Sequence, residues 1–177
     1  MDIYYADGSY DFKSGSLLPE LSIFLAGGIT NCPDWQKDMI ALLETSKLCC
    51  DEFVIFNPRY KLFDPLVFSL LDQVRWEFKH LCDATIILFW FPKESVCPIA
   101  LFELGKWLSH LDKPIFIGAE KGYPRMEDLH CQVYLERPEL KIVTSLEELA
   151  NQVIEAAGKE TKSSTITHVA HCGYPDV

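Results

Sequence analysis

Basic residues are scarce in this 177-residue chain, which has 16 lysines and arginines against 26 aspartates and glutamates and a formal net charge of -10. The sequence contains no basic stripe that could neutralise phosphates, which argues against nucleic acid as a partner. No apolar run is long enough to span a membrane, and the first residues are polar and acidic, unlike a signal peptide. We therefore expect a cytoplasmic protein without membrane contact.

Disulfide and cofactor patterns are missing as well. The seven cysteines have no regular spacing and form no C-x-x-C pair, so we expect free thiols in a reducing compartment. His168, His171 and Cys172 have a metal-like spacing, but they lack a fourth ligand and make a poor zinc site. No third glycine follows Gly27 and Gly28, so the G-x-G-x-x-G dinucleotide pattern is absent. We expect neither a metal nor a cofactor.

Strand and helix patterns alternate along the chain, 49% of which is hydrophobic. Apolar strand-like runs cover residues 21–26, 53–56, 85–91, 114–117 and 141–143. Helical patterns begin near Pro33 and cover residues 65–81, 99–108 and 146–157. This alternation predicts an α/β fold with a five-stranded parallel sheet, flavodoxin-like and doubly wound, with helices on both faces. The domain is expected at 21–158, between an N-terminal extension at 1–20 and a tail at 159–177.

Polar residues and glycines follow the first three predicted strands. In an open parallel sheet, ligands bind beyond the carboxyl ends of the strands, near the point where the strand order reverses. In a flavodoxin-like order this point lies between the first and third strands. The residues at this edge are Gly27 and Gly28 after the first strand, Asn57 and Arg59 after the second, and Glu94 and Ser95 after the third. We predict a ligand pocket there.

Glu103 lies within an otherwise apolar helical stretch directly after this edge. At helical spacing, Ile99 and Trp107 share its face, one turn before and one turn after it. A carboxylate on an apolar stripe is costly to bury unless its desolvation is compensated. Glu103 is therefore either paired, for example with Lys106 or a backbone amide, or reserved for chemistry.

Four segments, in this order, carry a family resemblance. They are IFLAGGITNCPDWQ at 23–36, FNPR at 56–59, QVRWEFKHLCDATIILFWFP at 73–92 and ESVCPIALFELG at 94–105. Together they resemble the nucleoside 2-deoxyribosyltransferase family, more closely its deoxyribosyltransferase-like branch. The resemblance implies that the Gly-Gly loop lines a nucleoside pocket and that the glutamate of an E-[LI]-G motif attacks the sugar. Glu103-Leu104-Gly105 matches that motif. A homo-oligomer is also implied, because in relatives the C-terminal end helps to complete a neighbour's site.

The resemblance also implies a carboxylate near Trp76 that contacts and protonates the base. Glu77 is the candidate, with Asp72 and Asp83 as alternatives for the same role. Protonation is needed because a nucleobase anion is a poor leaving group. The structural alternative for Glu77 is a solvated residue on the helix surface.

Each of three further candidate residues could have either of two roles. Asp34 could bind a sugar hydroxyl or begin a helix, and Trp35 could stack on a base or anchor the core. Arg59 could bind a 5'-phosphate or pair with an acid such as Asp64. The predicted substrate-binding set comprises Gly27, Gly28, Asp34, Trp35, Asn57, Arg59, Trp76, Glu94, Ser95 and Pro98.

These observations predict an enzyme that cleaves or exchanges the N-glycosidic bond of a small-molecule nucleoside or nucleotide, with Glu103 as nucleophile. A carboxylate suits this chemistry because it stabilises an oxocarbenium-like transition state and can capture the sugar covalently. Hydrolysis of a deoxynucleotide or of a nicotinamide dinucleotide is a close alternative. An alternative from another class is a module that binds a nucleotide derivative without turning it over.

Overall fold

The computed structural model describes residues 1–11, 21–46, 53–61 and 69–160. Within these ranges the strands are β1 (Asp2–Tyr5), β2 (Tyr10–Asp11), β3 (Ser22–Gly27), β4 (Val54–Asn57), β5 (Ile86–Phe91), β6 (Ile115–Ala119) and β7 (Ile142–Val143). The helices are α1 (Trp35–Thr45), α2 (Leu70–Asp83), α3 (Pro98–Leu108), α4 (Met126–Glu136) and α5 (Leu146–Glu160). The start of the predicted helix at 65–81 and the tail from residue 161 lie outside the described residues.

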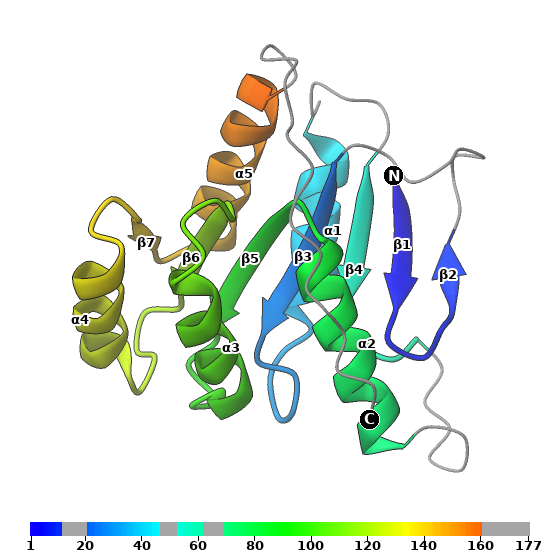
Figure 1. Cartoon of the computed structure of the whole chain (residues 1–177), viewed down its shortest axis with the longest axis horizontal. Helices are drawn as coiled ribbons and strands as arrows, with labels where there is room; N and C mark the ends of the chain where they lie inside the picture. Colours follow the sequence, from blue (N-terminus) through cyan, green and yellow to red (C-terminus); the bar gives the residue numbers. More distant parts are fainter. Residues whose placement is uncertain (12–20, 47–52, 62–68, 161–177) are drawn as a thin grey trace.

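The strands form one sheet in the order β2-β1-β4-β3-β5-β6-β7 (Figure 1). All neighbours pair in parallel except β1 and β2, which are antiparallel. The five predicted strands correspond to β3 to β7, and their spatial order β4-β3-β5-β6-β7 is the expected flavodoxin-like one. This confirms the α/β class and places the reversal of strand order between β3 and β5.

The predicted number of strands was too low, because β1 and β2 extend the sheet beyond β4. Residues 2–5 and 10–11 therefore belong to the sheet, although we had assigned them to an N-terminal extension. As the outermost strands, β1 and β2 do not need the continuous apolar sequence of a central strand. Only Asp2 and Ile3 are buried in β1, so its sequence has no strong strand pattern. Helix α4 was also not predicted, and it buries only Leu129 and Val133.

Two helical layers cover the sheet (Figure 1). Helices α2, α3 and α4 pack on the face that carries Phe24, Ala26 and Phe89, whereas α1 and α5 pack on the opposite face with Leu25 and Leu88. Because both faces are covered, every residue of β5 is buried, as expected for the centre of a parallel sheet. None of the helices in the described part of the chain is long and apolar enough to cross a membrane.

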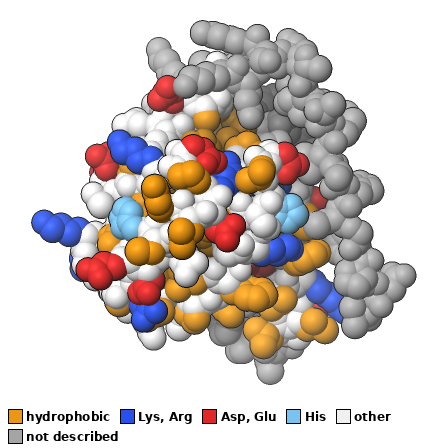
Figure 2. Space-filling view, turned by 60° about the vertical axis from the view of Figure 1, so that its left-hand side comes forward, with side chains coloured by type: hydrophobic (Ala, Val, Ile, Leu, Met, Phe, Trp, Pro, Cys, Tyr) orange, Lys and Arg blue, Asp and Glu red, His pale blue; other side chains and the backbone are white. Residues whose placement is uncertain are grey.

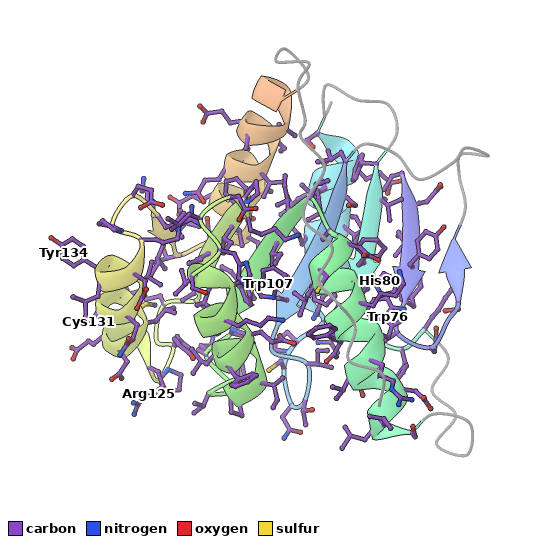
Figure 3. All side chains as sticks on the ribbon, viewed as in Figure 1. Trp76, His80, Trp107, Arg125, Cys131 and Tyr134 are labelled. Carbon is purple, nitrogen blue, oxygen red and sulfur yellow. The ribbon has the colours of Figure 1, made fainter. Side chains whose placement is uncertain are left out.

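The outer surface over α3 and α4 is mixed in character. Figure 2 shows acidic, basic and hydrophobic side chains interspersed on this face. Tyr134, Cys131 and Arg125 of the α4 region point outward from the body of the protein (Figure 3), and Tyr134 is 70% exposed.

Candidate active site

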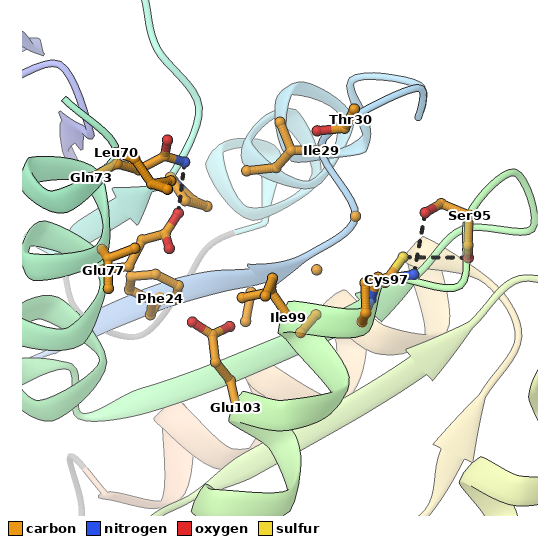
Figure 4. Close-up of a pocket in the computed structure, with 17 residues that line it drawn as sticks. Phe24, Ile29, Thr30, Leu70, Gln73, Glu77, Ser95, Cys97, Ile99 and Glu103 are labelled. Atoms are coloured by element: carbon orange, nitrogen blue, oxygen red, sulfur yellow. Dashed lines mark hydrogen bonds between the residues drawn. The ribbon is translucent and has the colours of Figure 1, made fainter. Parts of the chain in front are cut away.

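A cavity of about 510 Å³ lies at the carboxyl edge, where the strand order reverses. Its walls come from β3 and the loop after it, from α2, and from the first half of α3 (Figure 4). The lining residues are Phe24, Ala26, Gly27, Gly28, Ile29, Thr30, Pro58, Leu70, Gln73, Val74, Glu77, Ser95, Cys97, Pro98, Ile99, Ala100 and Glu103. The lining is thus mainly apolar, with two carboxyl groups from opposite walls.

Glu103 enters the cavity from α3. Pro98 occupies the first turn of this helix, where a missing N–H has no cost, and Cys97 precedes it with a positive φ of 52°. Within the described residues the Glu103 carboxyl has no hydrogen-bond or ion-pair partner. Lys106, the partner considered above, lies over the Phe78 ring at 4.2 Å instead. The Glu103 carboxyl therefore has no partner among the described residues, and it faces the cavity.

The pKa of Glu103 is raised from its usual 4.5 to about 8, mainly by burial of the side chain. The negative charge of Glu77 contributes to this shift, and the ammonium of Lys106 opposes it in part. The raised pKa favours the protonated form of Glu103 near neutral pH.

Glu77 faces Glu103 from α2, and the two carboxyl groups point into the cavity from opposite walls (Figure 4). The side-chain amide of Gln73 donates a hydrogen bond to Glu77 Oε1 at 3.0 Å, and the hydroxyl of Tyr60 donates to Gln73 Oε1 at 3.0 Å. Burial raises the pKa of Glu77, while the bond from Gln73 lowers it. Gln73 was not identified from the sequence, although its spacing of four residues from Glu77 puts both on one helix face.

The two carboxyl groups titrate as a coupled pair. Gln73 stabilises the charged form of Glu77, and no comparable donor reaches Glu103 within the described residues. The hydrogen bond therefore favours ionisation of Glu77 over that of Glu103, and the charge of Glu77 raises the pKa of Glu103.

Gly27 and Gly28 line the cavity, but packing alone requires glycine at both positions. A Cβ atom on Gly27 would lie 2.1 Å from the carbonyl oxygen of Trp90, and one on Gly28 would lie 2.7 Å from the sulfur of Cys97. The Gly28 N–H also donates to the Trp90 carbonyl at 3.4 Å. The glycines thus permit β3 to end tightly against β5 and the start of α3, which forms the floor of the cavity.

Asp34 and Trp35 lie outside the cavity lining. Asp34 is the N-cap of α1 and accepts a hydrogen bond from the backbone of Lys37 at 3.3 Å. Trp35 is only 2% exposed and packs in the core on the opposite face of the sheet. Its indole N–H donates to the Gly28 carbonyl at 2.8 Å, so Trp35 supports the cavity floor from behind. Asp34 therefore begins helix α1, and Trp35 is a core residue.

Arg59 and Asn57 are engaged with each other and with the start of α1. The Arg59 guanidinium donates to Gln36 Oε1 and to the Pro33 carbonyl, both at 2.7 Å, and forms an ion pair with Asp34 at 3.1 Å. The side chain of Asn57 accepts from the Arg59 backbone at 3.1 Å. Neither residue lines the cavity, and Asp64 lies outside the described residues. Arg59 is thus turned toward the α1 N-terminus.

Trp76 and Glu94 are also outside the lining, whereas Ser95 and Pro98 belong to it. Trp76 packs toward the sheet with its ring 4.2 Å from that of His80 and 6.0 Å from that of Phe24 (Figure 3). Glu94 lies 3.9 Å from Lys93. Trp76 thus forms a second layer behind the Phe24 wall.

The alternatives to Glu77 lie elsewhere on α2. Asp72 accepts a hydrogen bond from the Ser69 hydroxyl at 2.6 Å in the first turn, and Asp83 pairs with Lys79 near the last turn. Neither lines the cavity. Glu77 is therefore the α2 carboxyl that faces Glu103.

Metal ligands do not gather in the described part of the chain, where no group of three or more His, Cys, Asp or Glu residues could hold an ion. His168, His171 and Cys172 lie outside that part. Several apolar lining residues, including Phe24, Ile29 and Ile99, were not identified from the sequence. Their apolar character is equally compatible with the core, so the sequence carries no signal that separates the two environments.

A doubly wound α/β protein with two facing carboxyl groups at its topological switch point is the class that this geometry defines. The chain belongs to the family described as nucleoside 2-deoxyribosyltransferase like, whose model matches residues 20–123. The match includes β3 to β6, α1 to α3 and every residue of the cavity lining. A search of curated proteins returned no match to this chain.

Proposed function

We propose that this protein cleaves the N-glycosidic bond of nucleosides and transfers the sugar through a covalent ester on Glu103. The observation that carries the proposal is the pair of half-buried carboxyl groups, Glu77 and Glu103, that face each other across an otherwise neutral cavity. Membership of the family supports the same reaction type.

In the first step the Glu103 carboxylate forms a bond to the anomeric carbon while the carbon–nitrogen bond breaks. The bonding electrons pass to the base nitrogen, which takes a proton from Glu77. Glu103 must be ionised and Glu77 protonated for this step, whereas the hydrogen bond from Gln73 favours the charged form of Glu77. A base nitrogen that accepts a hydrogen bond from Glu77 favours the protonated form of that carboxyl and so opposes the effect of Gln73.

In the second step the nitrogen of an acceptor base attacks the anomeric carbon, and the ester bond to Glu103 breaks. The acceptor loses a proton to the Glu77 carboxylate, which restores both groups. If water attacks in place of a base, the same proton balance holds and the product is the free sugar. Transfer and hydrolysis therefore share the machinery and differ in which nucleophile reaches the ester first.

The test compares wild-type protein with Glu103→Gln on a panel of nucleosides, deoxynucleosides and nucleotides, with released base measured by chromatography. The substitution keeps the size of the side chain and removes the nucleophile, so base release should fall by several orders of magnitude. Glu127→Gln, an exposed substitution on α4, is the control for loss of one charge. Normal turnover by a folded Glu103→Gln protein would overturn the assignment. Ligand binding without base release by wild-type protein would support a binding module instead.

The ester itself is tested with a 2-fluoro-2-deoxy nucleoside, whose electron-poor sugar slows the second step. Intact mass should increase by one sugar, and peptide mapping should assign the adduct to Glu103. A transferase discharges this adduct faster when free adenine or cytosine is added. Equal discharge with and without added base would indicate a hydrolase.

A further inference from the structure

The charges that line the cavity are of one sign. Of the described residues that form its walls, Glu77 and Glu103 alone carry side chains that ionise near neutral pH, since burial raises the pKa of the Cys97 thiol to about 11. Among the described lining residues there is neither lysine nor arginine. A phosphate placed here would meet one or two carboxylates and no cation from that set.

Two described cations at the carboxyl edge of the sheet, Arg59 and Lys93, are bound to other groups. Arg59 is bound to Asp34, Gln36 and the Pro33 carbonyl, and burial of its guanidinium among these partners leaves it facing α1. Lys93 is paired with Glu120.

Lys106 lies 4.2 Å from the ring centre of Phe78 and 4.9 Å from that of Trp107. It acts on Glu103 at a distance without forming an ion pair with it. The field in the cavity is therefore negative.

Building on the function proposed above, we propose that the cavity selects N-glycosides whose base carries a fixed positive charge and whose sugar carries no phosphate. Nicotinamide ribosides are one such chemical class, and N-alkylated purine nucleosides are another. The carboxylate of Glu77 is the group that recognises the cationic base.

The surroundings of Glu77 suit such a substrate. The hydrogen bond from Gln73 favours the charged form of Glu77, and a cationic base beside it favours that form further. The same positive charge near Glu103 lowers the pKa of that carboxyl, so substrate binding favours the ionised nucleophile. The other groups that act on this pair are Gln73 from α2 and Lys106 from α3, and both favour the charged forms.

Cleavage of a cationic nucleoside also requires no general acid to protonate the leaving base. Glu103 forms its bond to the anomeric carbon, the carbon–nitrogen bond breaks, and the electron pair neutralises the positive nitrogen. The base leaves as a neutral molecule and takes no proton. Water then attacks the ester, its proton passes to Glu77, and Glu103 is released as a carboxylate. The net reaction of the cationic nucleoside with water yields the sugar, the neutral base and one proton.

Binding is tested by calorimetry with Glu103→Gln and four ligands that vary the charge of the base and the presence of a phosphate. They are nicotinamide riboside, its reduced neutral form, and the 5'-monophosphates of both. The cationic riboside should bind at least tenfold more tightly than the reduced form, and each phosphate should weaken binding at least fivefold. Tighter binding of the phosphorylated ligands, or equal binding of the cationic and neutral ribosides, would overturn the proposal.

Turnover by wild-type protein separates this proposal from the function on which it rests. Nicotinamide riboside should show a kcat/KM at least tenfold above those of neutral deoxynucleosides, each rate being divided by its uncatalysed rate. If neutral deoxynucleosides are cleaved as well or better, the selectivity is wrong and the proposed function stands. If no compound of either class releases its base, the proposed function is itself wrong.

A pair of matched variants tests whether Glu77 recognises the cationic base. In wild-type background, Glu77→Gln should raise the KM of nicotinamide riboside at least tenfold, whereas Glu127→Gln should leave it unchanged. Circular dichroism and melting curves check that both variants are folded. A folded Glu77→Gln protein with an unchanged KM for the cationic riboside would contradict the assignment.

Discussion

Gln73 donates a hydrogen bond from its side-chain amide to the carboxylate of Glu77 at 3.0 Å, one turn further along α2. The hydroxyl of Tyr60 donates a hydrogen bond to the oxygen of the same amide. Because this bond favours the charged form of Glu77, it favours loss of the first proton from Glu77 rather than from Glu103. The order of ionisation in the cavity therefore depends on a residue that carries no charge.

Replacing Gln73 by methionine should raise the pKa of Glu77, since the variant keeps the side-chain length and loses the donor. The measurement is a carboxyl carbon titration by NMR with labelled glutamate. Gln132→Met, at an exposed position of α4, is the matched control and should leave the Glu77 titration unchanged. An unaltered Glu77 pKa in folded Gln73→Met would show that the bond has no influence on the pair.

The pH profile of kcat/KM should change in Glu77→Gln. In wild-type protein, activity on a nitrophenyl deoxyriboside should increase as pH approaches 8, because Glu103 has a pKa of about 8 and its ionised form is the nucleophile. Removing the charge of Glu77 lowers that pKa, so the rise should move to lower pH. It should remain above 4.5 because burial, the largest cause of the shift, is retained.

The same variant separates protonation from packing. The nitrophenyl leaving group departs without a proton, so Glu77→Gln should spare this substrate while strongly reducing turnover of ordinary purine and pyrimidine nucleosides. Equal losses on both substrates would mean that Glu77 positions the substrate rather than protonating it.

Glu103→Gln should stabilise the fold at alkaline pH. The folded pKa of Glu103 is raised from 4.5 to about 8, so between these values the folded state binds more protons than the unfolded state. The free energy of unfolding therefore falls as pH rises through this window, and the substitution removes this loss.

The expected gain at pH 8 is ~2 kcal/mol, because each pKa unit corresponds to about 1.4 kcal/mol and a half-buried group is partly screened. Urea denaturation at pH 4 and pH 8 provides the check. Equal stabilities of the two proteins at both pH values would contradict the raised pKa.

Two glycines should respond in opposite directions to alanine. Gly27→Ala should destabilise the fold by ~3 kcal/mol or more, since its Cβ would lie 2.1 Å from a backbone oxygen. Gly105→Ala, inside α3 with nothing within 4 Å of the added Cβ, should stabilise it by about 0.5 to 1 kcal/mol. Thermal melting of both variants tests the pair, and similar melting temperatures would refute the packing argument.

Trp35→Phe should weaken both the fold and the cavity floor. It removes the 2.8 Å bond to the Gly28 carbonyl, at an expected cost of about 1 to 2 kcal/mol beyond the lost contacts, and KM should rise. Trp107→Phe is the matched control, because its buried indole N–H has no partner among the described residues. The free energy of unfolding lost in Trp35→Phe should exceed that lost in Trp107→Phe by the contribution of one hydrogen bond. If Trp107→Phe is as harmful as Trp35→Phe, the bond to Gly28 contributes nothing.

The sequence alone was sufficient to predict the parallel core and to single out Glu103 as a candidate nucleophile. The strands at 21–26 and 85–91 are apolar except for Ser22 and Thr85 near their starts, and such nearly continuous runs are typical of a sheet covered on both faces. Glu103 stood out for the complementary reason, as one charge on an apolar helix face. Both features are local, so the chain order is enough to recognise them.

Tertiary structure decided which of the edge residues face the cavity. Trp35 and Glu77 belong to helices on opposite sides of the sheet, and only packing determines that Trp35 supports the floor while Glu77 lines the wall. Arg59 was an equally plausible phosphate ligand until its contacts with Gln36 and Asp34 were visible. Hydrogen-bond partners distant in the chain leave no periodic pattern, because their geometry arises only after the strands and helices have packed.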